Sequence, residues 1–186
     1  MKTKDQLRKK FLVLRKKKYF NISKEKFNQL ANYIKSRNKT KKIISIALYY
    51  PSYYEIDILK IIKTLEKYKV KLLLPKIKNG NLLKFVVWNK NDILIVNKFG
   101  IPEPLNEKKS YLPDIVLVPL LAFDGKMNRL GYGKGFYDRY LNNLFRLNKK
   151  IEAIGVAFSF QKYKNIPSSK YDFKLNNVFT EKGFLL

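Results

Sequence analysis

The strongest constraint on the fold is a series of short apolar segments that alternate with helical patterns. The clearest segment is Asp114-Ile-Val-Leu-Val118, an almost continuous apolar run that is typical of a strand covered on both faces of its sheet. Further strands are expected over residues 43–48, 70–74 (stopped by Pro75), 82–88 and 151–158, with a short last strand near 178–180. Strands that alternate with helices predict an α/β layered fold with a mainly parallel sheet.

Four stretches carry the apolar spacing of helices. Over residues 3–18, Leu7, Phe11 and Leu14 fall on one face among lysines. The other helices are expected from about Ser23 onwards, over 55–68 and over 136–147. The remaining signals indicate a turn at Asn79-Gly80 and connecting loops over 97–112 and 119–135.

Composition limits both the class of protein and the chemistry available to it. A chain of 186 residues is expected to fold as one domain, here residues 1–186, and we expect a cytoplasmic monomer. The chain contains no apolar run of about 18 residues, so no membrane span is expected, and its charged N-terminus is unlike a secretory signal. Cysteine and histidine are both absent, which excludes disulfides, thiol or histidine catalysis and metal sites built from these residues.

The net charge is +26, from 40 basic and 14 acidic residues. Such a charge is compatible with a nucleic-acid partner and would attract polyanionic small ligands such as nucleotides. A second interpretation is compositional, because Lys, Asn, Ile, Phe and Tyr are abundant, as in proteins of A+T-rich genomes, and the lysines are spread along the chain. We expect the compositional explanation to hold and nucleic acid not to be the partner.

The densest cluster of functional signals is Arg129-Leu-Gly-Tyr-Gly-Lys-Gly-Phe-Tyr-Asp138. Its three alternating glycines allow a tight turn that exposes backbone N–H groups to an anion, and the helix expected from residue 136 would direct its positive end to the same place. The spacing differs from that of the P-loop and of the dinucleotide-binding fingerprint. A plain strand-to-helix turn would explain one or two of the glycines. With Arg129 and Lys134 beside them, the segment predicts a phosphate-binding loop.

Several polar residues have two open interpretations. Asp138, in the first turn of the expected helix, is either a favourable charge at the helix N-terminus or a ligand of a Mg²⁺ ion that also binds phosphate. Glu55 follows a strand, where open α/β sheets place ligands, and could accept hydrogen bonds from ring N–H groups or simply stabilise a helix start. Lys4 and Arg8 share a helix face, for which a solvated basic surface is the simplest interpretation. Asp172 is an isolated carboxylate.

Taken in order along the chain, these motifs resemble those of the 5-formyltetrahydrofolate cyclo-ligases, also called 5,10-methenyltetrahydrofolate synthetases. The most specific motif is Arg129–Leu141, and the resemblance extends over nearly the whole chain. The other matching segments are Lys4-x-x-x-Arg8, Glu55–Asp57, Leu74–Lys76, Pro113–Pro119, Ala122–Asp124, Gly155–Phe158, Ile166-Pro and Asp172. The resemblance implies a three-layer α/β/α sandwich with a mixed, mainly parallel central sheet.

The resemblance also implies an ATP-dependent ligase of one-carbon metabolism. Such an enzyme converts the small molecules 5-formyltetrahydrofolate and ATP into 5,10-methenyltetrahydrofolate, ADP and phosphate, with Mg²⁺ as the metal. Transfer of the γ-phosphoryl group to the formyl oxygen would turn a poor leaving group into a good one, which suits a chain without histidine. N10 of the folate would then attack, and phosphate would depart.

Roles for individual residues follow from the resemblance where this chain matches the motifs of the family. The implied catalytic residues are Arg129, Lys134 and Tyr137. The implied ATP-binding residues are Lys4, Arg8, Arg129, Leu130, Gly131, Tyr132, Gly133, Lys134, Gly135, Phe136 and Tyr137. The implied folate-binding residues are Tyr50, Glu55, Tyr132, Gly133, Lys134, Gly135 and Phe136, and the implied Mg²⁺ ligands are Asp138 and Asp172.

Two other functions are compatible with the residues alone. A basic protein rich in aromatic residues could bind RNA or DNA, and a salt-dependent affinity without folate conversion would be its sign. An enzyme that acts on sugar phosphates or transfers acyl groups could share the phosphate-binding loop on a similar sheet and need no ATP.

Overall fold

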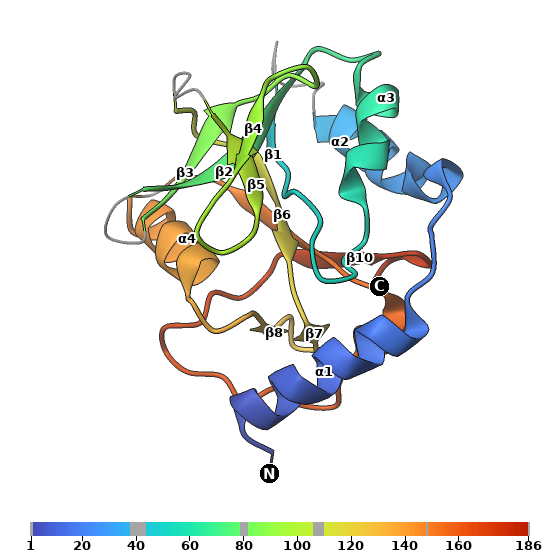
Figure 1. The fold of residues 1–186 in the computed structure, drawn as a ribbon, viewed down its shortest axis with the longest axis vertical. Coiled ribbons are helices and arrows are strands. Elements are labelled where there is room, and N and C mark those ends of the chain that lie inside the picture. The colour runs from blue at the N-terminus through green and yellow to red at the C-terminus, as the bar shows by residue number, and fades with distance from the viewer. Residues whose placement is uncertain (1, 38–43, 79–81, 106–109, 148, 186) are drawn as a thin grey trace.

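The computed structural model describes residues 2–37, 44–78, 82–105, 110–147 and 149–185 (Figure 1). These residues form a seven-stranded sheet with the strand order β11-β10-β9-β6-β1-β2-β3. Its strands are β1 (Ile44–Ala47), β2 (Val70–Lys78), β3 (Leu82–Val87), β6 (Ile115–Pro119), β9 (Glu152–Val156), β10 (Asn177–Thr180) and β11 (Gly183–Phe184). The strands from β10 to β2 are parallel, and the edge strands β3 and β11 are antiparallel to their neighbours. The predicted mixed, mainly parallel sheet is therefore confirmed.

Helices cover both faces of this sheet, as the apolar run in β6 predicted. Ile115 and Leu117 of β6 belong to the core on one face, and Val116 and Val118 to the core on the other. The first core is completed by α2 and α3, and the second by α4, which makes a three-layer sandwich. The helices are α1 (Lys4–Lys18), α2 (Asn28–Arg37), α3 (Ile62–Leu65) and α4 (Phe136–Arg146), with 3-10 turns at Lys24–Phe27, Ile58–Ile61 and Ser159–Gln161.

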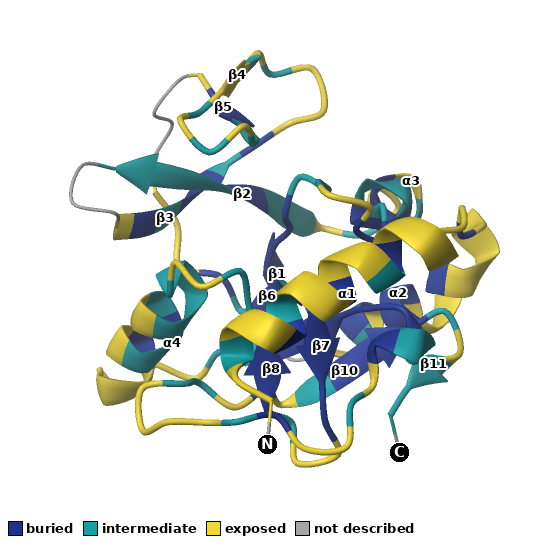
Figure 2. Cartoon of the chain, turned by 60° about the horizontal axis from the view of Figure 1, so that its bottom comes forward, coloured by how far each residue is buried: buried dark blue, intermediate teal, exposed yellow. Residues whose placement is uncertain are grey.

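Helix α1 lies apart from both layers and crosses below the sheet at the carboxyl ends of its parallel strands (Figure 1). Thr3 caps it in a capping box with Gln6, which satisfies two N–H groups at its start. Its buried face packs Leu7 and Phe11 against a small apolar cluster that includes Leu130. In Figure 2 the central strands are buried, whereas the outer faces of α1 and α4 are exposed. Helix α1 therefore forms one wall at the edge of the sheet where ligands of α/β proteins bind.

The helix predicted over 55–68 is shorter than expected. It begins as a 3-10 turn at Ile58 and contains a single α-helical turn that ends at Leu65. Asp57 accepts a hydrogen bond from the backbone N–H of Leu59 (3.2 Å) and so marks its start. An apolar repeat of three to four residues suits both helix types, so the sequence pattern could not separate them.

Strand β2 continues through Pro75, where the sequence predicted a stop. Pro75 lies opposite Phe85 of β3. The N–H of Trp88 donates to the carbonyl of Leu72 (3.0 Å), so in the alternating antiparallel pattern Pro75 directs its nitrogen away from β3. On that other side β1 has already ended, opposite Leu73. The proline therefore removes no hydrogen bond of the sheet, as is usual for proline at a strand edge.

Two stretches predicted as loops contain short hairpins. At the first of them, residues 97–112, β4 (Leu94–Val96) pairs with β5 (Pro102–Pro104). Within the second, residues 119–135, β7 (Ala122–Phe123) pairs with β8 (Arg129–Leu130). In the β7–β8 turn, Asp124 Oδ1 accepts hydrogen bonds from the backbone N–H groups of Lys126 (2.9 Å) and Asn128 (3.0 Å). Strands of two or three residues are too short to show an alternating pattern in the sequence.

The other predicted elements agree with the structure within a few residues at their ends. The last predicted strand is β10, and the edge strand β11 after it was not predicted. Ile43 and the turn predicted at Asn79-Gly80 lie outside the described residues. None of the described helices combines the length and the apolar character needed to cross a bilayer.

Candidate active site

A pocket of about 540 Å³ lies at the carboxyl ends of β1 and β6. Its walls come from α1, the segment after β1, the β4–β5 hairpin and the loop that leads into α4. The site residues from the sequence analysis all line this pocket: Lys4, Arg8, Tyr50, Glu55, Arg129, Leu130, Gly131, Tyr132, Gly133, Lys134, Gly135, Phe136, Tyr137, Asp138 and Asp172. Segments far apart in the chain therefore meet in one cavity, and the roles of the individual residues stay predictions.

The glycine loop has a backbone that only glycine adopts without strain. Gly133 and Gly135 have φ values of +97° and +67°, in the left-handed region. A Cβ atom on Gly133 would lie 3.2 Å from the Arg8 guanidinium carbon, and one on Gly135 would lie 2.8 Å from Arg139 Nη1. Gly135 also precedes α4 without a side-chain cap, which leaves the first-turn N–H groups suited to an anion. The loop thus combines a helix N-terminus with two nearby guanidinium groups.

Arg129 is a buried cation at the base of this loop. Only 6% of it is exposed, and its Nη2 donates to Asp138 Oδ1 at 2.7 Å. Its Nη1 donates to the carbonyl oxygen of Phe173 at 3.3 Å. Burial lowers the pKa of Arg129, and the neighbouring Asp138 carboxylate opposes this effect. The guanidinium is therefore oriented before any ligand binds.

Two further cations reach the pocket from α1. Lys4 Nζ forms an ion pair with Asp172 Oδ2 at 2.6 Å, and Arg8 Nε donates to the carbonyl oxygen of Gly131 at 3.0 Å. Burial raises the pKa of Asp172, but hydrogen bonds from Lys4 and Ser169 outweigh it and hold that pKa below its ordinary value. Both cations lie one turn apart on the same helix, so α1 presents them together to whatever anion occupies the loop.

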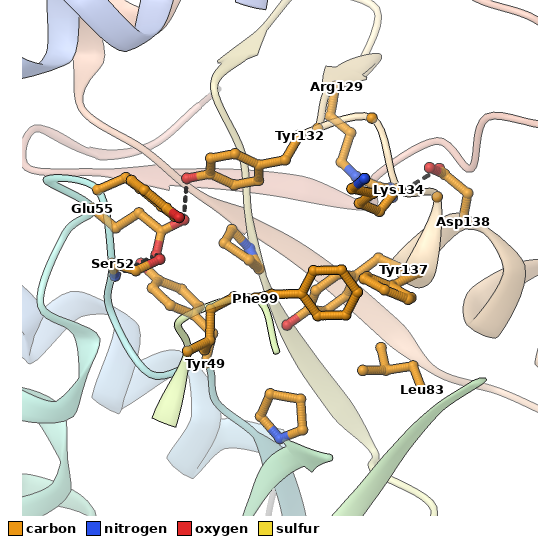
Figure 3. A pocket seen from close by; sticks show the side chains of 18 of the residues that line it. Tyr49, Ser52, Glu55, Leu83, Phe99, Arg129, Tyr132, Lys134, Tyr137 and Asp138 are labelled. Atoms are coloured by element: carbon orange, nitrogen blue, oxygen red, sulfur yellow. Dashed lines mark hydrogen bonds and ion pairs between the residues drawn. The ribbon is translucent and has the colours of Figure 1, made fainter. Parts of the chain in front are cut away.

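Glu55 provides a buried carboxylate at the opposite end of the pocket (Figure 3). It is 7% exposed, and its Oε2 accepts a hydrogen bond from the backbone N–H of Ser52 at 2.8 Å. Its Oε1 accepts a hydrogen bond from the hydroxyl of Tyr132. Burial raises the pKa of Glu55. The chain turns sharply just before it, because Tyr53 and Tyr54 have left-handed φ values of 48° and 62°.

The two ends of the pocket differ in chemistry, and aromatic rings lie between them (Figure 3). Arg129, Lys134 and Asp138 lie on one side of the view and Glu55 on the other, with Tyr137 between them. Burial raises the pKa of Tyr137 far above its ordinary value, so its phenol is a neutral donor near pH 7. An elongated ligand with an anionic end and a planar polar end would match this arrangement.

Asp138 and Asp172 are the two carboxylates on the cationic side. Asp138 Oδ1 accepts from Arg129 and from the backbone N–H of Phe173 (3.0 Å), while its second oxygen has no bond to another described residue. Within the described ranges, no three acidic side chains gather into a group that could hold a metal ion. Two carboxylates still suit Mg²⁺, which completes its octahedral shell with water and phosphate oxygens. The donor set therefore fits a magnesium ion that arrives with a phosphate ligand.

The pocket also contains residues that the sequence analysis did not place in a site. Asn97, Phe99 and Ile101 line it from the β4–β5 hairpin. The ring of Phe99 meets the ring of Phe136 edge to face, with 5.3 Å between centroids. The only sequence signal there is an aromatic residue beside Gly100 in a stretch predicted as a loop. Its contact with the glycine loop is tertiary and leaves no local pattern.

Comparisons with known proteins point to one family. The model of the 5-formyltetrahydrofolate cyclo-ligase family matches residues 1–181. A 5-formyltetrahydrofolate cyclo-ligase of Haemophilus influenzae is 35% identical over 140 residues, which cover 72% of this chain and 74% of that protein. One of Mycoplasma genitalium is 32% identical over 137 residues, which cover 73% of this chain and 72% of that protein.

Two solved structures are also similar. The NMR structure of a 5,10-methenyltetrahydrofolate synthetase from Aquifex aeolicus has a TM-score of 0.69 and 34% identity, with 97% of this chain and 91% of that chain covered. The synthetase from Mycoplasma pneumoniae has a TM-score of 0.69 and 26% identity, with 96% and 98% covered. Fold, motifs and family model agree over almost the whole length, so the chain belongs to the 5-formyltetrahydrofolate cyclo-ligase family.

Proposed function

We propose that this protein uses Mg·ATP to cyclise 5-formyltetrahydrofolate to 5,10-methenyltetrahydrofolate, with release of ADP and phosphate. The observation that carries the proposal is a single pocket with a buried carboxylate at one end and a glycine loop among cations at the other. The carboxylate end suits the N–H groups of a pterin, and the cationic end suits a triphosphate. Membership of the cyclo-ligase family favours these small molecules over nucleic acid and over sugar-phosphate or acyl-transfer substrates.

In this mechanism the formyl oxygen attacks the γ-phosphorus of ATP. The bond between that phosphorus and the oxygen that bridges it to the β-phosphate breaks, and ADP leaves. The phosphorylated formyl group is then a good electrophile, because its oxygen can depart as phosphate. N10 of the folate attacks the formyl carbon, gives up its proton and closes the ring. The protein's task is to align these atoms and to stabilise charge, as in other phosphoryl-transfer sites.

The cationic end would bind ATP. The N–H groups of the glycine loop, together with Lys4 and Arg8, contact the phosphates. Lys134 and Arg129 lie nearest the transferred group and stabilise the charge that develops on its oxygens. Arg129 is suited to this because Asp138 already fixes its orientation.

Asp138 and Asp172 would hold the magnesium ion. When bound, Mg²⁺ neutralises charge on the phosphate oxygens. Asp172 lies beside Lys4 at 2.6 Å, so a cation for the phosphate and a ligand for the metal are neighbours. Asp138 keeps one oxygen on Arg129 and has a second oxygen to offer.

At the folate end, Glu55 would accept hydrogen bonds from the pterin, with Tyr50 and Tyr132 beside it. Gly133, Lys134, Gly135 and Phe136 would contact the folate near its formyl group. The phenol of Tyr137 is held neutral and points into the same space, where it can donate a hydrogen bond to the reacting oxygen. It cannot act as a base near neutral pH.

The direct test is a spectroscopic assay with purified protein, 5-formyltetrahydrofolate and Mg·ATP. The methenyl product absorbs in the near ultraviolet, and its band is expected to grow only when 5-formyltetrahydrofolate and Mg·ATP are both present. Omission of ATP and omission of Mg²⁺ are the matched controls. A flat trace from correctly folded protein would contradict the proposal and direct attention to oligonucleotide binding or to an activity that needs no ATP.

A further inference from the structure

Arg15 is a buried cation that lies behind the pocket wall. It sits on the inner face of α1 with 1% of its surface exposed, and it does not line the pocket itself. Its Nη1 donates to the carbonyl oxygen of Leu120 at 3.2 Å, and its Nη2 donates to the hydroxyl of Tyr132 at 2.7 Å. It forms no direct ion pair with a carboxylate of the described residues. Burial of a charge in this way is costly unless the charge has a compensating interaction.

The compensating interaction runs through Tyr132 to Glu55. The tyrosine hydroxyl accepts a hydrogen bond from Arg15 and donates one to Glu55 Oε1. A guanidinium cannot accept a hydrogen bond and a phenol has a single proton, so the direction of this relay is fixed. The Arg15 guanidinium also lies 5.5 Å from the centre of the Tyr132 ring, where a cation is attracted to the ring.

The charged surroundings of Glu55 single out Arg15. The titratable groups that interact with this carboxylate are Arg15 from α1, Tyr49 after β1, and Tyr132 and Tyr137 from the loop and start of α4. Burial raises the pKa of each of the three phenols, so all are neutral near pH 7. Burial also raises the pKa of Glu55, and the charge of Arg15 is the first effect that opposes it. Arg15 is thus the cation in this group that favours the carboxylate form.

We propose that Arg15 is a positioning residue for folate recognition: through the hydroxyl of Tyr132 it holds Glu55 as an oriented carboxylate that accepts hydrogen bonds from the pterin. This inference rests on the proposed function. It assigns to α1 two tasks along one face, since Lys4 and Arg8 line the phosphate end near the start of the helix and Arg15, further along it, supports the pterin end.

The test compares Arg15→Met with Lys16→Met, which removes one positive charge from an exposed position of the same helix. In Arg15→Met, KM for 5-formyltetrahydrofolate is expected to rise about tenfold, the effect of weakening a hydrogen bond to a charged group. KM for ATP and kcat stay unchanged, because the phosphate end is untouched. Lys16→Met is expected to keep the wild-type kcat and the wild-type KM for both substrates. A loss of folding alone would lower the amount of active enzyme and move neither KM.

The pH profile provides a second readout that a purely structural role would not move. Removal of the cation raises the pKa of Glu55 further, because the anionic form loses its favourable partner. The acid limb of kcat/KM for the folate therefore shifts to higher pH in Arg15→Met and not in Lys16→Met. In a Tyr132→Phe background the relay is already broken. Arg15→Met is therefore expected to raise KM for 5-formyltetrahydrofolate much less there than in the wild type.

The outcomes separate this inference from the proposed function. If the wild type forms the methenyl product while Arg15→Met keeps the wild-type folate KM and acid limb, the inference is wrong and the function stands. If the wild type forms no product, the function fails, and calorimetry with 5-formyltetrahydrofolate alone decides the positioning role by whether Arg15→Met binds more weakly. Should Arg15→Met not fold, Arg15→Gln, which also removes the charge, is measured instead, and an unchanged folate KM in that variant overturns the inference.

Discussion

Single residues of the pocket differ in how much of the fold depends on them. Arg129 is buried and holds both Asp138 and the carbonyl of Phe173, so its removal would disturb the loop as well as the site. Lys134 is exposed between two glycines and lines the same pocket. A change at Lys134 therefore separates chemistry from stability better than a change at Arg129.

Lys134→Ala is expected to lower kcat about 10²- to 10³-fold, because it removes a charge that is proposed to stabilise the transition state. The melting temperature is expected to stay close to the wild-type value, since the side chain is exposed. Steady-state kinetics and thermal unfolding check both parts. Lys150→Ala, at an exposed position after α4, is the matched control and should change neither quantity. Near-normal turnover in Lys134→Ala would remove this lysine from the catalytic residues.

At the scale of elements, the β7–β8 hairpin carries Arg129 into the pocket and depends on one carboxylate. Asp124 is 1% exposed. Its Oδ1 accepts from the backbone N–H groups of Lys126 and Asn128, and its Oδ2 accepts from Asn128 Nδ2 and from the N–H of Ile166, both at 3.0 Å. Four donors on one side chain give Asp124 a structural role in the hairpin, although it does not line the pocket.

Asp124→Asn is expected to destabilise the fold by about 2 kcal/mol or more at pH 7. The reason is that the NH₂ group of the new amide would face N–H groups that themselves donate hydrogen bonds. Burial raises the pKa of Asp124, but its hydrogen bonds outweigh this and hold the pKa below the ordinary value. A lowered native pKa stabilises the fold above the unfolded pKa of about 3.9, and this contribution is lost as the pH falls through the native pKa. The difference in the free energy of unfolding between the wild type and Asp124→Asn should therefore shrink below about pH 4.

Urea unfolding at several pH values measures this difference. Glu66→Gln is the control, because Glu66 is an exposed carboxylate and its removal changes the net charge by the same amount. A difference between wild type and Asp124→Asn that stays constant at all pH values would show that the charge of Asp124 does not organise the hairpin.

At the scale of the whole molecule, the sequence could predict what local patterns encode. The apolar run of β6 predicted a sheet covered on both faces, and the spacing of the glycines predicted the tight turn before α4, where Gly133 and Gly135 have left-handed φ values. The binding of an anion by this loop stays a prediction. Phe99 and Arg15 could not be predicted in this way. Phe99 lies in a hairpin too short to show a pattern, and Arg15 opens a run of basic residues whose other members are exposed. Helical spacing places Arg15 on the face of Leu7 and Phe11, but its partner Tyr132 is evident only from the packing of α1 against the glycine loop.

The net charge of +26 also acts at the scale of the whole molecule. A field of this sign attracts anionic ligands from a distance and is screened by salt, whereas contacts inside the pocket are screened much less. An increase from about 0.05 M to about 0.5 M NaCl is therefore expected to lower kcat/KM for ATP several-fold and to leave kcat nearly unchanged. Initial-rate measurements at both salt concentrations check this, with sucrose as an uncharged control. An unchanged kcat/KM would show that the net charge does not attract ATP from a distance, and an equal loss of kcat would place the salt effect inside the site.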